Sequence, residues 1–263
     1  MNIIVCIKQV PGTSEVKIDE KTGSLIRDGI DSKMNPYDLY ALETALQIKQ
    51  GMVDAHITVL SMGPPQVQEI IQEAFLMGDV DGVILTDKRL AGADCLATAH
   101  AISQCIEKIG LPDLIICGKQ TTDGDTAQVG AEIAEFLQIP HITNVLKIEK
   151  IKAGSMVVEA DLPTMLQRAE IQFPALITVE KSLCQPRLPS FKRKKLITGQ
   201  KVQVYSVQDL SDHDETHYGL AGSPTQVMRI FPPETDTTSE MWEGNSRDLT
   251  EKLYQVLSER KFI

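Results

Sequence analysis

The chain has 263 residues and a formal net charge of −10, with 26 lysine and arginine residues against 36 aspartate and glutamate residues. A chain this acidic is expected not to have nucleic acid or an anionic membrane as its main partner. It contains no run of 18 apolar residues, as a transmembrane helix would need, and no basic segment precedes the first apolar run, so no signal peptide is expected. The five cysteines are scattered without a CxxC pair, which favours reduced thiols, a cytoplasmic location and no metal site.

The first 140 residues alternate short apolar runs with amphipathic segments. Strands are expected at 2–7, 56–61, 80–86 and 114–117, and helices at 36–51, at 66–77, within 91–110 and from 125 to 137. Strand–helix alternation at this spacing predicts an α/β fold with a mainly parallel, doubly wound sheet and helices on both of its faces.

Local signals mark where two of these helices begin. Asn35 is a good N-cap, Pro36 suits the first helical position, and Asp94 is a second good N-cap. Before the first of these helices, residues 13–34 are interpreted as an excursion in which 16–18 and 24–26 pair as a small hairpin.

The segment DLIICGKQTTDGDTAQVG, residues 113–130, is the most informative stretch of the chain. An apolar run is followed by Gly118, a polar loop, and a helical pattern that Asp125 and Gln128 are expected to cap. A buried strand, a glycine-bearing loop and a capped helix direct backbone N–H groups toward one point, as in the phosphate sites of open α/β sheets. An ordinary strand-to-helix turn is the alternative interpretation.

Beyond residue 140 the alternation stops. Apolar runs at 145–151, 155–160 and 174–179 have no helices of comparable length between them, so antiparallel strands are expected to extend the sheet. The mainly parallel α/β nucleotide-binding domain is therefore assigned to residues 1–183.

The remainder, 184–263, has a different composition. Prolines and a cationic cluster within 187–195 predict an extended arm, and the cluster is interpreted as a solvated face. An amphipathic helix is expected at 246–261. An arm, a loop and a terminal helix bury little within their own chain, so these residues are expected to pack on a partner subunit.

Several signatures of catalysis are absent from the sequence. It contains no GxxxxGK[ST] loop, no GxGxxG, no HExxH and no GxSxG, and no Cys–His pairing is evident. Among the five histidines only His213 and His217 are close in sequence, and that pair is interpreted as two surface residues. The sequence thus indicates nucleotide binding without hydrolysis, and no catalytic side chain is assigned.

Five motifs, in matching order, resemble the β subunit of electron-transfer flavoproteins. They are IVCIKQVPGT at 4–13, MNPYDLYALETAL at 34–46, VLSMGPP at 59–65, GKQTTDGDTAQVGAEIAEFLQIP at 118–140, and GLAGSPTQV at 219–227. The resemblance implies an adenine-nucleotide-hydrolase-like (HUP-type) fold and a heterodimer with an α subunit that carries FAD. It also implies a nucleotide site in the β chain itself, which takes either structural AMP or a second FAD.

A further stretch, GADCLATAH at 92–100, is similar to one that is typical of the electron-bifurcating members of this family. In those members NADH delivers a hydride to the β-chain FAD. One electron then passes to a flavin-containing dehydrogenase, of acyl-CoA, enoyl-CoA or lactate type, and the other to ferredoxin. The resemblance therefore implies FAD as cofactor and NADH as electron donor in a heterodimeric, NAD-dependent oxidoreductase complex. A conventional AMP-binding β subunit is the first alternative, and a free-standing nucleotide sensor is the second.

The resemblance also assigns the binding residues. Those expected to line the adenosine end are Cys6, Asn35, Pro36, Tyr37 and Met62, and those expected to open a second phosphate site are Asp94, Cys95 and Thr98. The ribose and phosphates are expected to be wrapped by Gly118, Lys119, Gln120, Thr121, Thr122, Asp123, Gly124, Asp125, Thr126, Ala127, Gln128 and Val129. Asp123 and Asp125 are expected to accept ribose hydroxyls or to cap backbone, because a carboxylate does not favourably face a phosphate.

Overall fold

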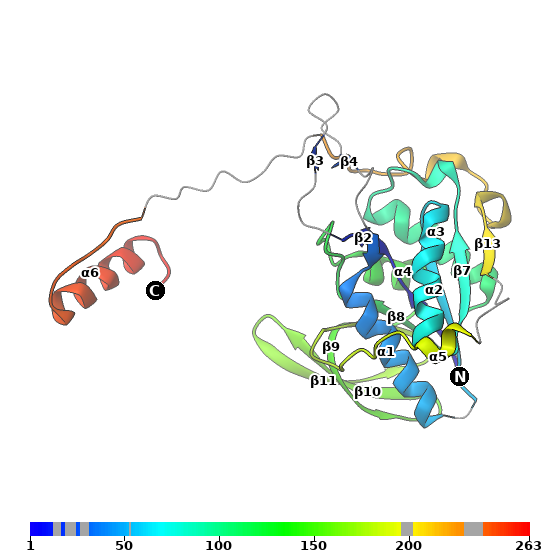
Figure 1. The fold of residues 1–263 in the computed structure, drawn as a ribbon, viewed down its shortest axis with the longest axis horizontal. Helices are drawn as coiled ribbons and strands as arrows, with labels where there is room; N and C mark the ends of the chain where they lie inside the picture. Colours follow the sequence, from blue (N-terminus) through cyan, green and yellow to red (C-terminus); the bar gives the residue numbers. More distant parts are fainter. Residues whose placement is uncertain (13–16, 19–24, 27–31, 53, 196–201, 229–238) are drawn as a thin grey trace. The chain divides into compact units, whose positions relative to one another are not determined.

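The computed structural model describes residues 1–12, 17–18, 25–26, 32–52, 54–195, 202–228 and 239–263 (Figure 1). The chain forms two compact units, Met1–Met228 and Arg229–Ile263. Residues 184–228 are thus grouped with the α/β unit, and their packing on a partner subunit stays a prediction. No helix in the described ranges is both long enough and apolar enough to cross a membrane.

A large sheet forms the centre of the first unit. Its strands are β1 (Asn2–Cys6), β6 (His56–Met62), β7 (Asp81–Leu85), β8 (Leu114–Gly118), β9 (His141–Ile151), β10 (Ser155–Leu162), β11 (Met165–Gln172), β12 (Ala175–Val179) and β13 (Val202–Tyr205). The order across the sheet is β11-β10-β9-β12-β8-β1-β6-β7-β13. All neighbours from β9 to β13 in this order pair in parallel, and β10 and β11 add an antiparallel edge. The predicted mainly parallel α/β sheet with antiparallel additions is confirmed.

Helices cover both faces of this sheet because each central strand is apolar on both sides. On one face, α1 (Pro36–Gly51) and α2 (Gln68–Met77) pack on side chains such as Val5 and Ile116 (Figure 1). On the other, α3 (Cys95–Ile109) and α4 (Val129–Phe136) pack on alternate residues such as Ile4 and Ile115. Successive residues of a strand point to opposite faces, so one short strand contributes to two cores.

Small elements surround the central sheet. β2 (Gln9–Pro11) pairs with β5 (Ser32–Met34), and β3 (Lys17–Ile18) pairs with β4 (Leu25–Ile26), both antiparallel. The second pairing confirms the expected hairpin for the residues described, whereas its positions 16 and 24 and its turn lie outside them. Short helical turns lie at η1 (Pro65–Val67), η2 (Lys88–Leu90), η3 (Val207–Asp209) and η4 (Glu215–His217), and α5 spans Phe191–Lys194.

The interpretation of the cationic cluster as a solvated face is wrong for its two arginines. Arg187 forms a two-pronged ion pair with the buried Glu43, with Nε–Oε2 and Nη2–Oε1 distances of 2.7 and 2.9 Å. Arg193 donates from Nε to the carbonyl oxygen of Phe75 at 2.9 Å and from Nη2 to that of Gly78 at 2.7 Å. These contacts fasten residues 187–193 to α1 and α2, while the neighbouring lysines remain exposed.

The second unit contains the expected terminal helix, α6 (Ser246–Glu259). Asn245 caps it by accepting hydrogen bonds from the N–H groups of Arg247 and Asp248 at 3.1 and 3.0 Å. None of its side chains is buried, although Leu253 and Tyr254 are apolar or aromatic. An amphipathic helix gains most of its stability by burying its apolar face, so the prediction that α6 packs on a partner is physically reasonable and stays a prediction.

Candidate nucleotide site

The candidate site lies at the carboxyl ends of the central strands. The chain adds β6 and β7 on one side of β1 and then returns to place β8 on the other side. Strand order therefore reverses between β1 and β8, and open α/β sheets bind ligands in the crevice outside the strands at such a point. Cys6, at the end of β1, is in register with Cys117 of β8. A hydrogen bond with Cys6 and burial hold the pKa of Cys117 well above its usual range, so that side chain remains a neutral thiol.

Asn35 ties the start of α1 to the loop after β8. Asn35 occupies the N-cap position before Pro36, the first residue of α1, as the sequence predicted. Its side chain is fully buried, however, and makes no capping hydrogen bond to the helix. The amide Nδ2 donates to the Gln120 carbonyl oxygen at 2.9 Å, and Oδ1 accepts from the Thr122 N–H at 3.2 Å. Because a buried amide must find partners for both its donor and its acceptor, Asn35 fixes the loop backbone at two points.

Asp38 and Gly118 bring α1 and β8 into direct contact. The buried Asp38 carboxylate accepts hydrogen bonds from Asn35 Nδ2 at 2.9 Å and from the Lys8 N–H at 2.7 Å. Burial raises its pKa to about 7, although these hydrogen bonds oppose the shift. A Cβ on Gly118 would lie 2.4 Å from Asp38 Oδ1 and 2.7 Å from Tyr37 Cβ. Only glycine allows the strand to approach the helix this closely.

Side-chain bonds hold the loop between β8 and α4. Lys8 Nζ binds both carboxylate oxygens of Asp123, at 2.9 and 2.8 Å, and Gln120 Nε2 donates to Asp125 Oδ1 at 2.6 Å. The ammonium of Lys119 pairs with Glu180 beyond β12. The loop is thus bonded to the end of β1 through Lys8, to the residue after β12 through Glu180, and to itself through Gln120 and Asp125.

The prediction that Asp125 caps the following helix is wrong. α4 begins at Val129, with Gln128 before it, and no side chain caps its N-terminus. Asp125 and Ala127 both adopt φ of 55°, a left-handed conformation that costs free energy for residues with a Cβ. Because of the turn at these two residues, the helix begins at residue 129 instead of the expected 125. Residues 122–128 form an exposed loop.

The helix start is well suited to an anion. Among the residues that the structure describes, no acceptor contacts the backbone N–H groups of Thr126, Ala127 and Gln128, which are exposed. One turn into α4, Glu132 Oε2 is buried and has no hydrogen-bond partner in the described part of the chain. Burial, and then the negative charge of Asp94, raise the pKa of Glu132 above its ordinary value. Free N–H groups at a helix N-terminus are what a phosphate requires.

A second helix start adjoins the first. Asp94 caps α3 as expected, with Oδ1 accepting from the Ala97 N–H at 3.1 Å. Cys95, the first residue of α3, donates from its thiol to the Thr126 hydroxyl at 3.2 Å. The Cys95 side chain therefore joins the N-terminus of α3 to the loop that precedes α4, while the Ala97 N–H of α3 is already taken by Asp94.

The segment 219–225 closes over the start of α3. The hydroxyl of Ser223 accepts from the Asp94 N–H at 2.8 Å, and Asp94 Oδ2 accepts from the Thr225 N–H and hydroxyl at 3.0 and 2.8 Å. Gly219 makes this possible: its φ is 54°, and a Cβ there would lie 2.0 Å from the Arg89 carbonyl oxygen.

Asp94→Ala is expected to lower the free energy of unfolding by about 0.5–2 kcal/mol, because the α3 cap is lost. It is also expected to speed amide hydrogen exchange at Thr225, whose acceptor disappears. Asp94→Asn is the matched variant, because asparagine keeps the cap but presents one oxygen fewer to Thr225. Urea unfolding and exchange measured on both variants separate the two roles; equal exchange at Thr225 in all three proteins would contradict the assignment.

The structure brings most of the predicted residues to one crevice, but not all by direct contact. Pro36 and Tyr37 form the first turn of α1 beside Gly118. Met62 ends β6 and Thr98 lies one turn into α3, and within the described residues neither side chain makes a polar contact with the loop. Nucleotide binding by the whole set stays a prediction.

Four polar residues of the site were missed by the sequence analysis: Lys8, Asp38, Ser223 and Thr225. Ser223 and Thr225 lie in the GLAGSPTQV motif, so that motif was a usable signal for them. Lys8 and Asp38 lie beside predicted site residues, but their partners are 115 and 30 residues away along the chain. A single sequence does not indicate such pairings.

Comparisons with known proteins agree on one family. Residues 22–209 match the electron transfer flavoprotein domain. The chain is 42% identical over 264 residues to an electron transfer flavoprotein subunit beta of Thermoanaerobacterium thermosaccharolyticum, and 100% of each chain is covered. It is 39% identical over 266 residues to the caffeyl-CoA reductase-Etf complex subunit CarD of Acetobacterium woodii, again with 100% of each covered. To protein FixA of Sinorhizobium fredii it is 36% identical over 273 residues, covering 97% of this chain and 94% of the relative.

Proposed function

Because the chain belongs to the electron transfer flavoprotein family, as a β subunit that pairs with an α subunit, we propose that its own site binds FAD for electron bifurcation. In this proposal NADH is the donor, and ferredoxin and a flavin-containing dehydrogenase are the two acceptors. The observation that carries the proposal is the junction of two helix N-termini, α3 and α4, at the Cys95–Thr126 contact.

Two donor groups side by side suit a diphosphate better than a single phosphate. The N–H groups of Thr126, Ala127 and Gln128 supply one; at the start of α3, where Asp94 already accepts from the Ala97 N–H, the Cys95 N–H and the positive end of the helix dipole supply the other. AMP carries one phosphate and would use only one of them, whereas FAD carries two. The buried Glu132 carboxyl group and the Asn35-fixed backbone at Gln120 and Thr122 add polar groups at the same edge.

When bound, FAD supplies the chemistry: it takes up a hydride as two electrons and releases them singly. The chain contributes placement. Asn35, Lys8 and Gln120 hold the loop, Gly118 allows the strand to approach α1, and the segment 219–225 covers the start of α3. The site is thus held by hydrogen bonds that link β1, α1, α3 and the loop after β8.

The partner dehydrogenase is proposed to act on an acyl- or enoyl-CoA or on lactate. One relative, CarD, is by its printed name a subunit of a caffeyl-CoA reductase complex, which favours the CoA class. We place the complex in the cytoplasm, where NADH and ferredoxin are available. A conventional subunit with structural AMP is the second candidate. The N–H groups at the start of α4 would be enough to bind its single phosphate.

NADH-dependent reduction of ferredoxin by the α–β complex tests the proposed function. Reduction is expected only when the dehydrogenase and its oxidised substrate are also present, with one electron reaching ferredoxin for each one reaching the dehydrogenase. The control omits the dehydrogenase substrate and should leave ferredoxin oxidised. An α–β complex that passes both electrons of NADH to the dehydrogenase, with no ferredoxin reduced, would contradict bifurcation while leaving the family assignment intact.

A further inference from the structure

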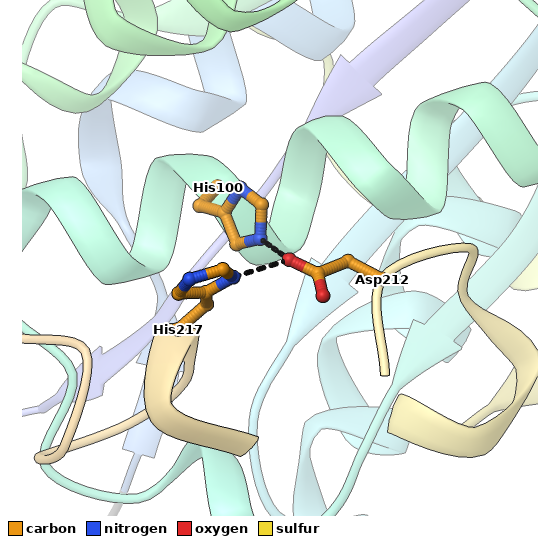
Figure 2. A group of neighbouring side chains, drawn as sticks. All are labelled: His100, Asp212 and His217. Atoms are coloured by element: carbon orange, nitrogen blue, oxygen red, sulfur yellow. Dashed lines mark hydrogen bonds and ion pairs between the residues drawn. The ribbon is translucent and has the colours of Figure 1, made fainter. Parts of the chain in front are cut away.

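Two histidine side chains, His100 and His217, converge on one carboxylate oxygen of Asp212. Asp212 Oδ2 lies 3.0 Å from His100 Nε2 and 2.6 Å from His217 Nδ1, as the dashed lines in Figure 2 show. The three atoms all lie within 4.8 Å of one another. His100 comes from α3, whereas Asp212 and His217 come from the segment after β13 (Figure 2). His213 and His217 are both exposed, as expected of surface residues, but His217 also contacts Asp212.

The cluster is preorganised by its neighbours. The second carboxylate oxygen of Asp212, Oδ1, accepts from the Asp214 N–H at 2.9 Å, which leaves Oδ2 to face the two rings. The hydroxyl of the buried Tyr218 donates to the Asp212 carbonyl oxygen at 2.7 Å. The His100 ring packs between Phe136 and Tyr218, each with a ring-centroid distance of 5.3 Å. Asp212 and His100 are thereby held in place by groups that lie outside the cluster.

The chemistry of the cluster suits a borderline divalent metal. An aspartate side chain such as that of Asp212 is ordinarily ionised at neutral pH. Two imidazole nitrogens and one carboxylate oxygen form a common protein ligand set for zinc, which binds them at about 2.0–2.2 Å in tetrahedral geometry. At those bond lengths neighbouring ligand atoms are separated by roughly 3.3 Å, so small side-chain rotations from the observed distances are sufficient.

The surroundings also supply an outer partner. His217 Nε2, the nitrogen that points away from Asp212, lies 3.9 Å from Asp214 Oδ2. Metal-binding histidines usually donate their other ring N–H to a carboxylate, which fixes the tautomer and the ring orientation. Asp214 is itself held by the Thr216 N–H at 2.9 Å and the Thr216 hydroxyl at 2.6 Å. The half-exposed His217 leaves the fourth position to solvent.

We propose that His100 Nε2, Asp212 Oδ2 and His217 Nδ1 bind a divalent cation of the zinc type, with water as the fourth ligand. The ion cross-links α3 to the segment that continues into 219–225. That segment also holds Asp94, at the N-terminus of the same helix and six residues before His100, through Ser223 and Thr225. Metal binding would thus stabilise the cover of the candidate nucleotide site from outside it, whichever nucleotide is bound there.

The experiment uses the full-length chain in complex with its α subunit, stripped with a chelator and titrated with Zn²⁺ against a competing indicator. One Zn²⁺ per heterodimer is expected to bind at this cluster. His217→Gln is the main variant because its side chain is half exposed and its replacement should not disturb folding; His100→Ala is the second. Each is expected to weaken Zn²⁺ binding at least tenfold. His213→Gln, an exposed neighbouring histidine outside the cluster, is the control and should bind as the parent protein does.

Thermal unfolding provides an independent readout. Saturating Zn²⁺ is expected to raise the Tm of the parent complex and of His213→Gln, because a ligand that binds only the folded state stabilises it. It should leave the Tm of His217→Gln unchanged. The proposal is overturned if the parent complex binds no Zn²⁺, in which case the trio is a hydrogen-bonded clamp. It is equally overturned if His217→Gln and His100→Ala bind Zn²⁺ as the parent does, since the ion would then lie elsewhere.

Discussion

Gly118→Ala is expected to weaken nucleotide binding by at least tenfold and to lower the free energy of unfolding by about 1–3 kcal/mol, the usual cost of overpacking. The added Cβ would lie 2.4 Å from Asp38 Oδ1, 2.7 Å from Tyr37 Cβ and 2.8 Å from the Tyr37 carbonyl carbon. The last of these is backbone and cannot rotate away. The loop after β8 must therefore move off α1, and with it the N–H groups that face the crevice. Titration of the α–β complex, freed of the β-chain nucleotide, with FAD and with AMP measures the loss.

Two glycine variants control for this effect. Gly124→Ala lies in the same loop, but its Cβ would meet nothing closer than Thr121 Oγ1 at 3.4 Å. Gly154→Ala is remote from the crevice, and a Cβ there meets no atom within 4 Å. Gly154→Ala is expected to bind nucleotide within about twofold of the parent, and Gly124→Ala is expected to keep the parent's free energy of unfolding because its Cβ meets no close contact. Parent-like affinity in Gly118→Ala would show that the contact between β8 and α1 does not shape the site.

Asp38→Asn is expected to change how stability depends on pH. Burial raises the pKa of Asp38 from 3.8 to about 7 in the folded chain, so the unfolded chain loses this proton first as the pH rises. The protonated group therefore favours folding at low pH, and this contribution is lost as the pH rises through about 7. Asparagine does not titrate. From about pH 5 to about pH 8 the free energy of unfolding of the parent should therefore fall by about 2–3 kcal/mol relative to that of the variant.

Urea unfolding of both proteins across that range checks this prediction. The variant also loses one acceptor, since its amide offers a single oxygen to Asn35 Nδ2 and the Lys8 N–H. That penalty does not vary with pH, so it offsets the two curves without changing the slope of their difference. Asp54→Asn, at an exposed position, is the control and should run parallel to the parent. Parallel curves for Asp38→Asn as well would mean that Asp38 is ionised throughout.

The sequence was sufficient for the central architecture and for the family. The strands at β1, β6, β7, β8 and β12, and the helices between them, follow from apolar runs and from helix-start signals such as Pro36 at the first helical position and the N-cap Asp94. Family membership rests on motifs that the comparisons confirm. Local chemistry settles these features, because a buried parallel strand is apolar on both faces and a helix start has its own residue preferences.

Two strands of the central sheet were missed for a physical reason. β11 and β13 lie at the two edges of the sheet, and most of their side chains are exposed or half-buried. Their residues therefore lack the apolar run or the strict alternation that marks an internal strand. What makes them strands is the register with a neighbour, β10 for one and β7 for the other, and a sequence read by itself does not reveal a neighbour.

The site residues show the same distinction: those marked by a local sequence pattern were predicted, and those brought together by distant contacts were not. Gly118 and the loop after it were found because glycine and polar residues between a strand and a helix form a local pattern. The predicted helix start at Asp125 was wrong because Asp125 and Ala127 adopt a left-handed conformation that prolongs the loop. Neither residue type by itself predicts that conformation. The His100–Asp212–His217 cluster joins residues 112 and 5 positions apart and has no local signature.

The most direct test of the account is to purify the chain with its α subunit, denature the complex, and quantify the nucleotides released. The central claim is that the β-chain crevice, with donors from both α3 and α4, holds FAD. It predicts two FAD per heterodimer and no AMP. One FAD and one AMP would contradict it: the crevice would then be a structural AMP site, and the electrons would pass only through the α subunit.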